Sequence, residues 1–240
     1  MRMLLIAVAA ATLLGAACAP VERTQRSRLP ATPTPRVQTL IAVDPRQLVL
    51  DEKGFIPGQW TMQEGTLFTG QWNRAWDRDP ADPGAAAGAT RVTIQASLFP
   101  SLEESAEKFA QTALGVGGQE TIRRVIALRG FDPAQIQVTE VPLDGLGLDQ
   151  QAAWRAEFAR GPATGERYVQ YFVYLRVRNV HATLTTFAQS VNGAEAPRLL
   201  EETKQLAQRE AALLRAQPAT PQVVPTPAGP SATGPGPSRN

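Results

Sequence analysis

The chain has 240 residues, of which 43% are hydrophobic and 19% are charged, and its formal net charge is +2. This balance is typical of a globular protein, and the chain without its low-complexity ends, about 180 residues, fits one domain. The basic residues are scattered rather than clustered, which argues against nucleic-acid binding.

The N-terminus has the layout of a secretory signal. Arg2 supplies a short positive region, and the apolar stretch from Met3 to Leu14 is too short to span a bilayer comfortably. Small residues then lead directly into Cys18, the only cysteine of the chain. We expect residues 1–17 to be a signal peptide. The alternatives are a plain signal with an incidental cysteine, or an N-terminal membrane helix that stays uncleaved.

The run Leu14-Gly15-Ala16-Ala17-Cys18 resembles the bacterial lipoprotein signal, the lipobox, with its leucine one place earlier than usual. The resemblance implies a diacylglycerol on the sulfur of Cys18 and cleavage before that residue. Two acyl chains attach a protein stably, whereas one does so only marginally. A lone cysteine in an exported protein also lacks an internal disulfide partner. We therefore predict a lipid-anchored protein on the extracytoplasmic side of the cell membrane, or of the outer membrane in a two-membrane cell.

Composition divides the remainder of the chain into three parts. Residues 18–37 hold Cys18 and a proline-rich segment that we expect to be an extended tether. Residues 38–217 are expected to form one domain. Residues 218–240 are rich in proline, glycine, serine, alanine and threonine, so we predict a disordered tail.

The hydrophobic pattern of residues 38–217 predicts strands, a helical region, further strands and a long helix. The predicted strands are 59–63, 67–76, 91–99, 135–141, 152–159, 168–177 and 180–188. Ser101 and Glu104 form a capping box that opens a helix to about Leu114. The glycine-rich run 115–118 is expected to end that helix, and a shorter helix follows at 120–128. Residues 194–217 have an apolar stripe and predict a long amphipathic helix.

This order of elements is typical of an α+β fold, in which an antiparallel sheet packs against the long C-terminal helix. Residues 168–177 are apolar on both faces, which predicts a central strand covered on both sides. The hairpin of 168–177 with 180–188, followed by an amphipathic helix, resembles the end of a PsbP-like domain, named for an extrinsic photosystem II subunit. The resemblance spans about 48–217. It implies a binding or accessory module and assigns no catalytic residue.

The chain offers few groups for catalysis. His181 is the only histidine, so it has no second histidine or free cysteine with which to form a nucleophilic or zinc site. Asp77, Asp79 and Asp82 share one loop, but their spacing misses the EF-hand pattern and is interpreted as solvated turn residues. The glutamates at 103, 104 and 107 suit the start of a helix. We therefore predict no enzyme, no catalytic residue, no metal site and no cofactor.

Aromatic side chains are the strongest candidates for binding. As a ligand site they would line a groove on the sheet face away from the long helix, where apolar ligand sites often form. The residues are Trp60, Trp72, Trp76, Tyr168, Phe172 and Tyr174. The other interpretation is that they belong to the core, beneath the helical region 101–128, and we favour it because aromatic residues supply most of the core area in a domain of this size.

The sequence thus predicts a non-enzymatic, membrane-anchored lipoprotein that binds an unknown small molecule or protein. Its alternative is a structural or assembly factor that docks on a membrane or envelope complex. An enzyme with an unfamiliar carboxylate or metal site is a third hypothesis.

Overall fold

The computed structural model of the chain describes residues 35–66, 68–159, 166–190 and 196–224. These residues form an α+β fold with an antiparallel seven-stranded sheet and three α-helices. The predicted signal peptide, Cys18 and the tether up to residue 34 lie outside the described residues, as do residues 225–240. Within the described ranges, no helix is long and apolar enough to cross a bilayer.

The strands of the main sheet follow the order β2-β3-β4-β8-β7-β6-β5. Their bounds are β2 (Trp60–Gly65), β3 (Gln71–Arg78), β4 (Arg91–Leu98), β5 (Gln137–Glu140), β6 (Gln150–Ala159), β7 (Arg167–Val177) and β8 (Val180–Ser190). The β7–β8 hairpin closes at Val177 opposite Val180, and β4 then pairs with the outer side of β8. The first three strands of the sheet are therefore joined to the last four through β4 and β8.

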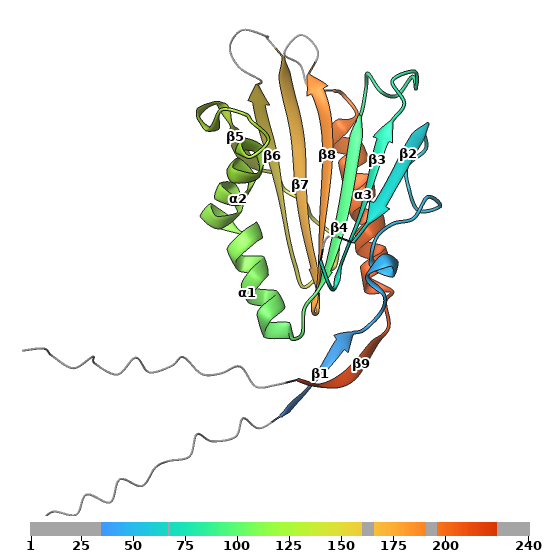
Figure 1. Ribbon diagram of the computed structural model, residues 1–240, viewed down its shortest axis with the longest axis vertical. Coiled ribbons are helices and arrows are strands. Elements are labelled where there is room, and N and C mark those ends of the chain that lie inside the picture. Colours follow the sequence, from blue (N-terminus) through green and yellow to red (C-terminus); the bar gives the residue numbers. More distant parts are fainter. Residues whose placement is uncertain (1–34, 67, 160–165, 191–195, 225–240) are drawn as a thin grey trace, which may run out of the picture. The chain divides into compact units, whose positions relative to one another are not determined.

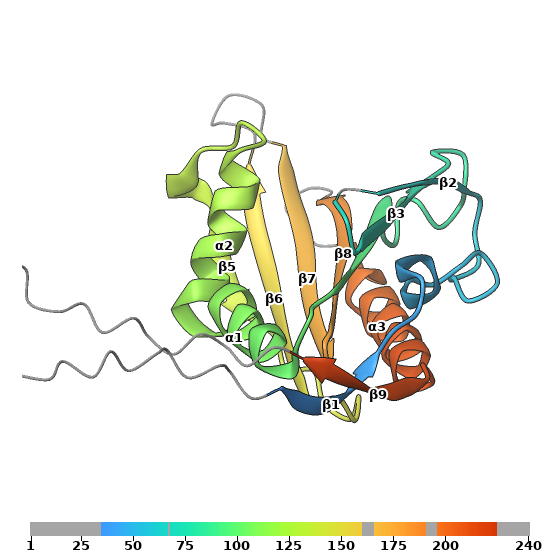
Figure 2. The same ribbon diagram turned by 60° about the horizontal axis from the view of Figure 1, so that its bottom comes forward.

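Helices cover both faces of this sheet (Figures 1 and 2). Helix α3 (Leu199–Arg215) packs on one face, while α1 (Leu102–Ala113) and α2 (Gly115–Ala127) pack on the other. Strand β7 contributes Val173 to the core beneath α3 and Phe172 to the core beneath α2. The predicted burial of both faces of this strand is confirmed, because successive side chains of a strand point to opposite faces.

Helix α1 begins as its sequence predicts, but α2 does not. The hydroxyl of Ser101 accepts a hydrogen bond from the amide of Glu104 at 3.1 Å, which caps α1. The run 115–118 was predicted to be only a helix stop, yet α2 begins at Gly115. A Cβ on Gly118 would come within 2.5 Å of the carbonyl oxygen of Ala113. Glycine is therefore required at this position for the close approach of the two helices.

A second, two-stranded sheet corrects the predicted limits of the domain. It pairs β1 (Arg36–Ile41) with β9 (Ala219–Val224), so the folded unit includes residues that were assigned to the tether and to the disordered tail. The domain limits were predicted too narrowly because both segments are rich in proline, which is typical of tethers and disordered tails. Pro221 is tolerated because a strand of a two-stranded sheet has one edge without ladder partners. Asn179 fastens β1 to the main sheet: its side chain accepts from the amide of Ile41 at 2.8 Å and donates to the carbonyl of Ile41 at 3.1 Å.

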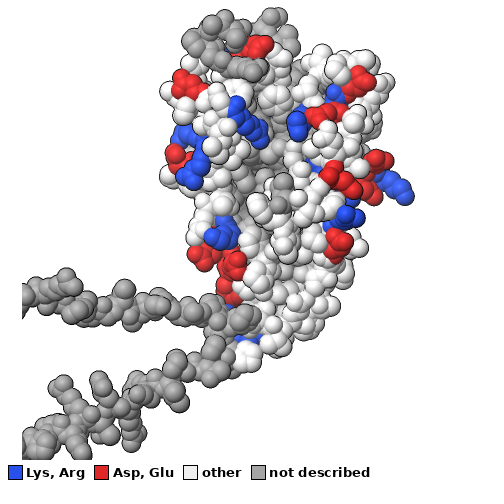
Figure 3. Space-filling model, in the orientation of Figure 1, with Lys and Arg blue, Asp and Glu red and all other residues white. Residues whose placement is uncertain are grey.

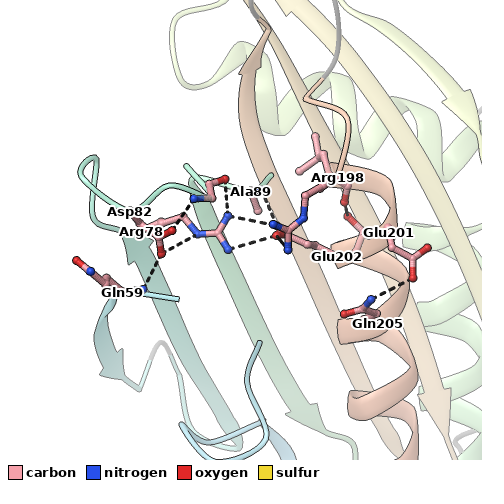
Figure 4. Close-up of polar contacts among 11 residues, drawn as sticks. Gln59, Arg78, Asp82, Ala89, Arg198, Glu201, Glu202 and Gln205 are labelled. Atoms are coloured by element: carbon pink, nitrogen blue, oxygen red, sulfur yellow. Dashed lines mark hydrogen bonds and ion pairs between the residues drawn. The ribbon is translucent and has the colours of Figure 1, made fainter. Parts of the chain in front are cut away.

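The segment between β3 and β4 is folded against α3 by a buried ionic network (Figure 4). Arg78 pairs with Glu202 of α3 at 3.2 Å, and Arg198 pairs with the same carboxylate at 3.3 Å. That carboxylate also accepts a hydrogen bond from the amide of Ala89 at 2.8 Å. Asp82, predicted to be solvated, is buried and accepts bonds from the amides of residues 59 and 84, which lower its pKa. The prediction of a solvated loop is wrong for Asp82, because these amides satisfy its carboxylate inside the fold.

Candidate functional site

The six aromatic residues predicted to share one groove are divided between the two faces of the sheet. The even-numbered positions of β3 point toward α3, whereas the even-numbered positions of β7 point toward α1 and α2. The residues on the α3 side are Trp60 of β2 and Trp72 and Trp76 of β3. The residues on the side of α1 and α2 are Tyr168, Phe172 and Tyr174 of β7. One groove lined by all six is therefore ruled out, since a seven-stranded sheet separates them.

Most of these aromatic side chains belong to the core, which is the interpretation that the sequence favours. Trp72, Trp76 and Phe172 are buried. Trp76 stacks on Phe55, with ring centroids 4.2 Å apart, and this pair closes the α3 side of the sheet near β2. Burial raises the pKa of the Tyr174 phenol to about 12, as expected for a ring enclosed by apolar neighbours. Trp60 and Trp76 also line a pocket of about 380 Å³ on the α3 side, whereas Tyr168 packs against the aromatic rings of a groove that combines basic and aromatic groups.

That groove, which we call the α2-side groove, lies where the helices leave part of the sheet uncovered. Its volume is about 500 Å³. Helices α1 and α2 pack over β5, β6, β7 and the adjoining edge of β8, so the polar positions of β4 and β8 beyond them remain accessible. Its lining residues come from four strands and from the segment after α2: Arg91, Thr93, Arg129, Phe131, Phe158, Gln170, Thr185 and Phe187.

Two arginine side chains give the groove its charge. Arg91 of β4 lies on one side and makes a long ion pair with Asp77 at 3.6 Å. Arg129, just after α2, donates a hydrogen bond to the side-chain oxygen of Gln170 at 3.2 Å. Among the described residues, no carboxylate pairs with Arg129. Figure 3 shows basic side chains on both sides of a hollow in this face of the molecule.

Arg129 is exposed at the groove, and the pKa of its side chain is lowered from the usual value of an arginine. Partial burial of the guanidinium is the larger cause, and the nearby positive charge of Arg91 lowers the pKa further. Gln170 is buried and offers only a neutral acceptor to this group. Two like charges that face one groove repel each other, and an anion between them relieves that repulsion. The arrangement therefore favours a negatively charged group.

Beside the arginines, aromatic rings form an apolar wall. Phe131 meets Phe158 edge-on, with centroids 4.6 Å apart, and Tyr168 stacks on Phe187 at 5.4 Å. Phe158 and Tyr168 stack at 5.8 Å and join the two pairs. Thr93 and Thr185 add hydroxyl groups to the floor of the groove. A few polar groups that orient a ligand against an apolar wall are the usual composition of a small-molecule site.

The residues that line this groove could not have been found from a local motif. They come from four strands and one loop, and each is unremarkable in its own segment. The available signal was the polar face of the strand 91–99, where Arg91 and Thr93 alternate with apolar residues. Which helix covers that face, and how far, depends on tertiary packing.

The other predicted candidates take structural positions. His181 lies beneath α1, where its Nε2 atom is 2.7 Å from the carbonyl of Ser105, and burial lowers its pKa to about 4. Glu103 pairs with Arg36 at 3.0 Å, which ties α1 to β1. Within the described ranges, no cluster of three or more histidine, cysteine or carboxylate groups could hold a metal ion.

Comparison with known proteins adds only remote similarity. No protein-family model and no curated protein sequence matches the chain. The solved structure of the Saccharomyces cerevisiae Ran-binding protein Mog1p is 11% identical over 66% of this chain and 93% of its own, with a TM-score of 0.33. The lipid transfer and protein localization domain of human StarD13 is 9% identical over 66% of this chain and 88% of its own, with a TM-score of 0.21. Similarity this remote carries no function over to the chain.

Proposed function

We propose that this protein is a lipid-anchored, non-enzymatic binding module that holds an anionic, partly apolar small molecule in the α2-side groove. The proposal is supported by geometry: the guanidinium groups of Arg91 and Arg129 line one groove beside three phenylalanine rings, and Arg129 has no carboxylate partner among the described residues. An organic carboxylate or sulfonate would satisfy both arginines through charge-assisted hydrogen bonds while its body lies against the aromatic wall.

The sequence supports the location. The run from Leu14 to Cys18 is similar to a lipoprotein signal, and the segment 19–34 supplies a tether of sixteen residues between the lipid and β1. A module on such a tether would present its groove to the extracytoplasmic space. We propose in addition that the domain is of the PsbP-like kind, on the pattern of its β7–β8 hairpin and α3.

A pair of fluorescent probes tests the groove. Anilinonaphthalene sulfonate carries the proposed combination of an anion and aromatic rings, and N-phenylnaphthylamine has the same rings without the charge. In the chain from Ala19 to Asn240, we expect the charged probe to bind more tightly than the neutral one. Arg129→Gln should weaken the charged probe about tenfold, because one charge-assisted hydrogen bond of about 1.5 kcal/mol is lost, and should leave the neutral probe unchanged.

The matched control is Arg124→Gln, which removes one positive charge from an exposed position of α2 outside the groove. It should bind both probes as the parent chain does. Equal loss in the two variants would mean that net charge, rather than the groove, attracts the probe. Equal affinity of the parent chain for both probes would contradict the proposed preference for an anion.

The anchor is tested separately in bacterial cells supplied with labelled palmitate. The full chain should incorporate the label and partition into detergent, and Cys18→Ser should do neither. Label retained in the Cys18→Ser variant would contradict lipidation at this cysteine.

A further inference from the structure

The two-stranded sheet of β1 and β9 presents apolar side chains to solvent. Val37 is 69% exposed and Val223 is 71% exposed, and the two lie directly opposite each other in the strand register. The next pair on the same face, Thr39 and Pro221, is also exposed. Directly opposed valines on a solvent-facing ribbon form a small apolar surface rather than isolated exposed residues.

A basic pocket lies beside this ribbon. Its volume is about 640 Å³, and Arg176, Arg178 and Arg215 line it together with Glu103 and Asp149. Both carboxylates are engaged within the fold, since Glu103 pairs with Arg36 and Asp149 accepts a hydrogen bond from the amide of Arg178 at 2.6 Å. Arg215 has no ion pair with any described residue. Three guanidinium groups therefore face one open pocket, and the Asp149 carboxylate offsets only part of their positive charge.

The backbone at Arg178 is held in an unusual conformation. Its φ angle is +52°, and no other non-glycine residue among those described has a positive φ. Glycine or asparagine avoids most of the steric penalty of this region, so an arginine here is unfavourable for the turn itself. The guanidinium of Arg178 reaches the carbonyl of Thr39 at 3.3 Å, which places it where the pocket meets the ribbon. Strained residues of this kind concentrate at binding sites.

We propose that this end of the domain, made of Val37, Val223 and the pocket of Arg176, Arg178 and Arg215, is a docking surface for the anionic phospholipid headgroups of a bilayer. The inference builds on the anchor proposed at Cys18, because the chain from that residue enters the domain at Arg36, next to the pocket. The guanidinium groups match headgroup phosphates, which they bind through two parallel hydrogen bonds. The two valines would lie at the boundary between headgroups and acyl chains.

Vesicle cosedimentation of the unlipidated chain from Ala19 to Asn240 tests this surface. Vesicles of phosphatidylcholine with about one third phosphatidylglycerol should bind the chain, and pure phosphatidylcholine should bind it weakly. Because a basic residue near an anionic surface contributes about fivefold in affinity, a variant with Arg176→Gln, Arg178→Asn and Arg215→Gln should bind about a hundredfold more weakly. Asparagine is chosen at residue 178 because it tolerates the positive φ.

The matched control changes the net charge equally in other places, with Arg123→Gln, Arg124→Gln and Arg167→Gln. It should keep most of the binding to anionic vesicles. Equal loss in the two triple variants, or equal binding to vesicles with and without phosphatidylglycerol, would overturn the proposal. The proposal would also be overturned if soluble glycerol phosphate bound the pocket as tightly as anionic vesicles bind the chain. The ribbon would then contribute nothing to membrane binding. Failure here leaves the probe experiment on Arg129 unaffected, since the groove lies on a different part of the domain.

Discussion

Glu210 is a fully buried carboxyl of α3 whose titration should control the stability of the domain. One of its oxygens accepts a hydrogen bond from the amide of Leu50 at 3.1 Å, and the other has no partner among the described residues. Burial raises the pKa of this carboxyl to about 8, although the amide of Leu50 and the positive charge of Arg74 both oppose the shift. The folded protein therefore retains a proton that the unfolded chain releases near pH 4.5.

The sign and size of the effect follow from proton linkage. Between about pH 4.5 and pH 8 the folded state binds one more proton than the unfolded state, so stability decreases as the pH rises. Each pH unit of this window corresponds to about 1.4 kcal/mol, which gives a total loss of about 5 kcal/mol from below pH 4.5 to above pH 8. Glu210→Gln keeps the size of the side chain and the acceptor for Leu50, and it removes the titration.

Urea denaturation across this pH range measures the difference between the two proteins. The free energy of unfolding of the parent chain should fall by about 5 kcal/mol relative to that of Glu210→Gln as the pH is raised. Glu201→Gln, which removes an exposed carboxylate from the same helix, is the control and should follow the parent. Parallel stability curves for the parent and Glu210→Gln would show that Glu210 does not titrate between pH 4.5 and pH 8 in the folded protein.

Three further predictions concern the packing around the sheet. Gly88→Ala places a methyl group against the buried carboxylate of Glu202. This change should lower the free energy of unfolding, measured by urea denaturation, by about 3 kcal/mol. An unchanged free energy of unfolding would contradict the tight contact. Asn179→Ala removes three hydrogen bonds that hold β1 and the end of β4. It should lower the free energy of unfolding by about 3 kcal/mol and speed proteolysis near β1. Unchanged proteolysis would contradict this role of Asn179. His181 should stay neutral above about pH 5, because burial lowers its pKa to about 4. Its nitrogen NMR signals should keep the pattern of a proton on Nε2, and a midpoint near pH 6.5 would contradict its burial.

Local patterns in the sequence located most of the strands and the start of α1. Alternation was decisive for β7, whose two apolar faces require a position inside the sheet, and the Ser101 hydroxyl caps α1 as its spacing predicts. These features depend on neighbours within a few residues, so the sequence contains what is needed to find them.

Features that depend on distant partners were missed. Strand β9 exists because β1 pairs with it from the other end of the domain, and its prolines alone indicate disorder. Asp82 is buried because amides from two segments reach its carboxylate, and α2 begins at Gly115 because glycine permits contact with α1. The prediction of a single aromatic groove was wrong for the same reason. The aromatic residues of β3 and β7 look alike in sequence, but the register of the sheet sends them to opposite faces.

Native mass spectrometry most directly tests the claim that this domain binds a ligand in the α2-side groove. The chain from Ala19 to Asn240 would be purified from a host related to its source and compared with its Arg129→Gln variant. We expect a stoichiometric extra mass on the parent chain that carries a carboxylate or sulfonate and is absent from the variant. A bare protein mass for both, together with equal affinity for the charged and neutral probes, would contradict it.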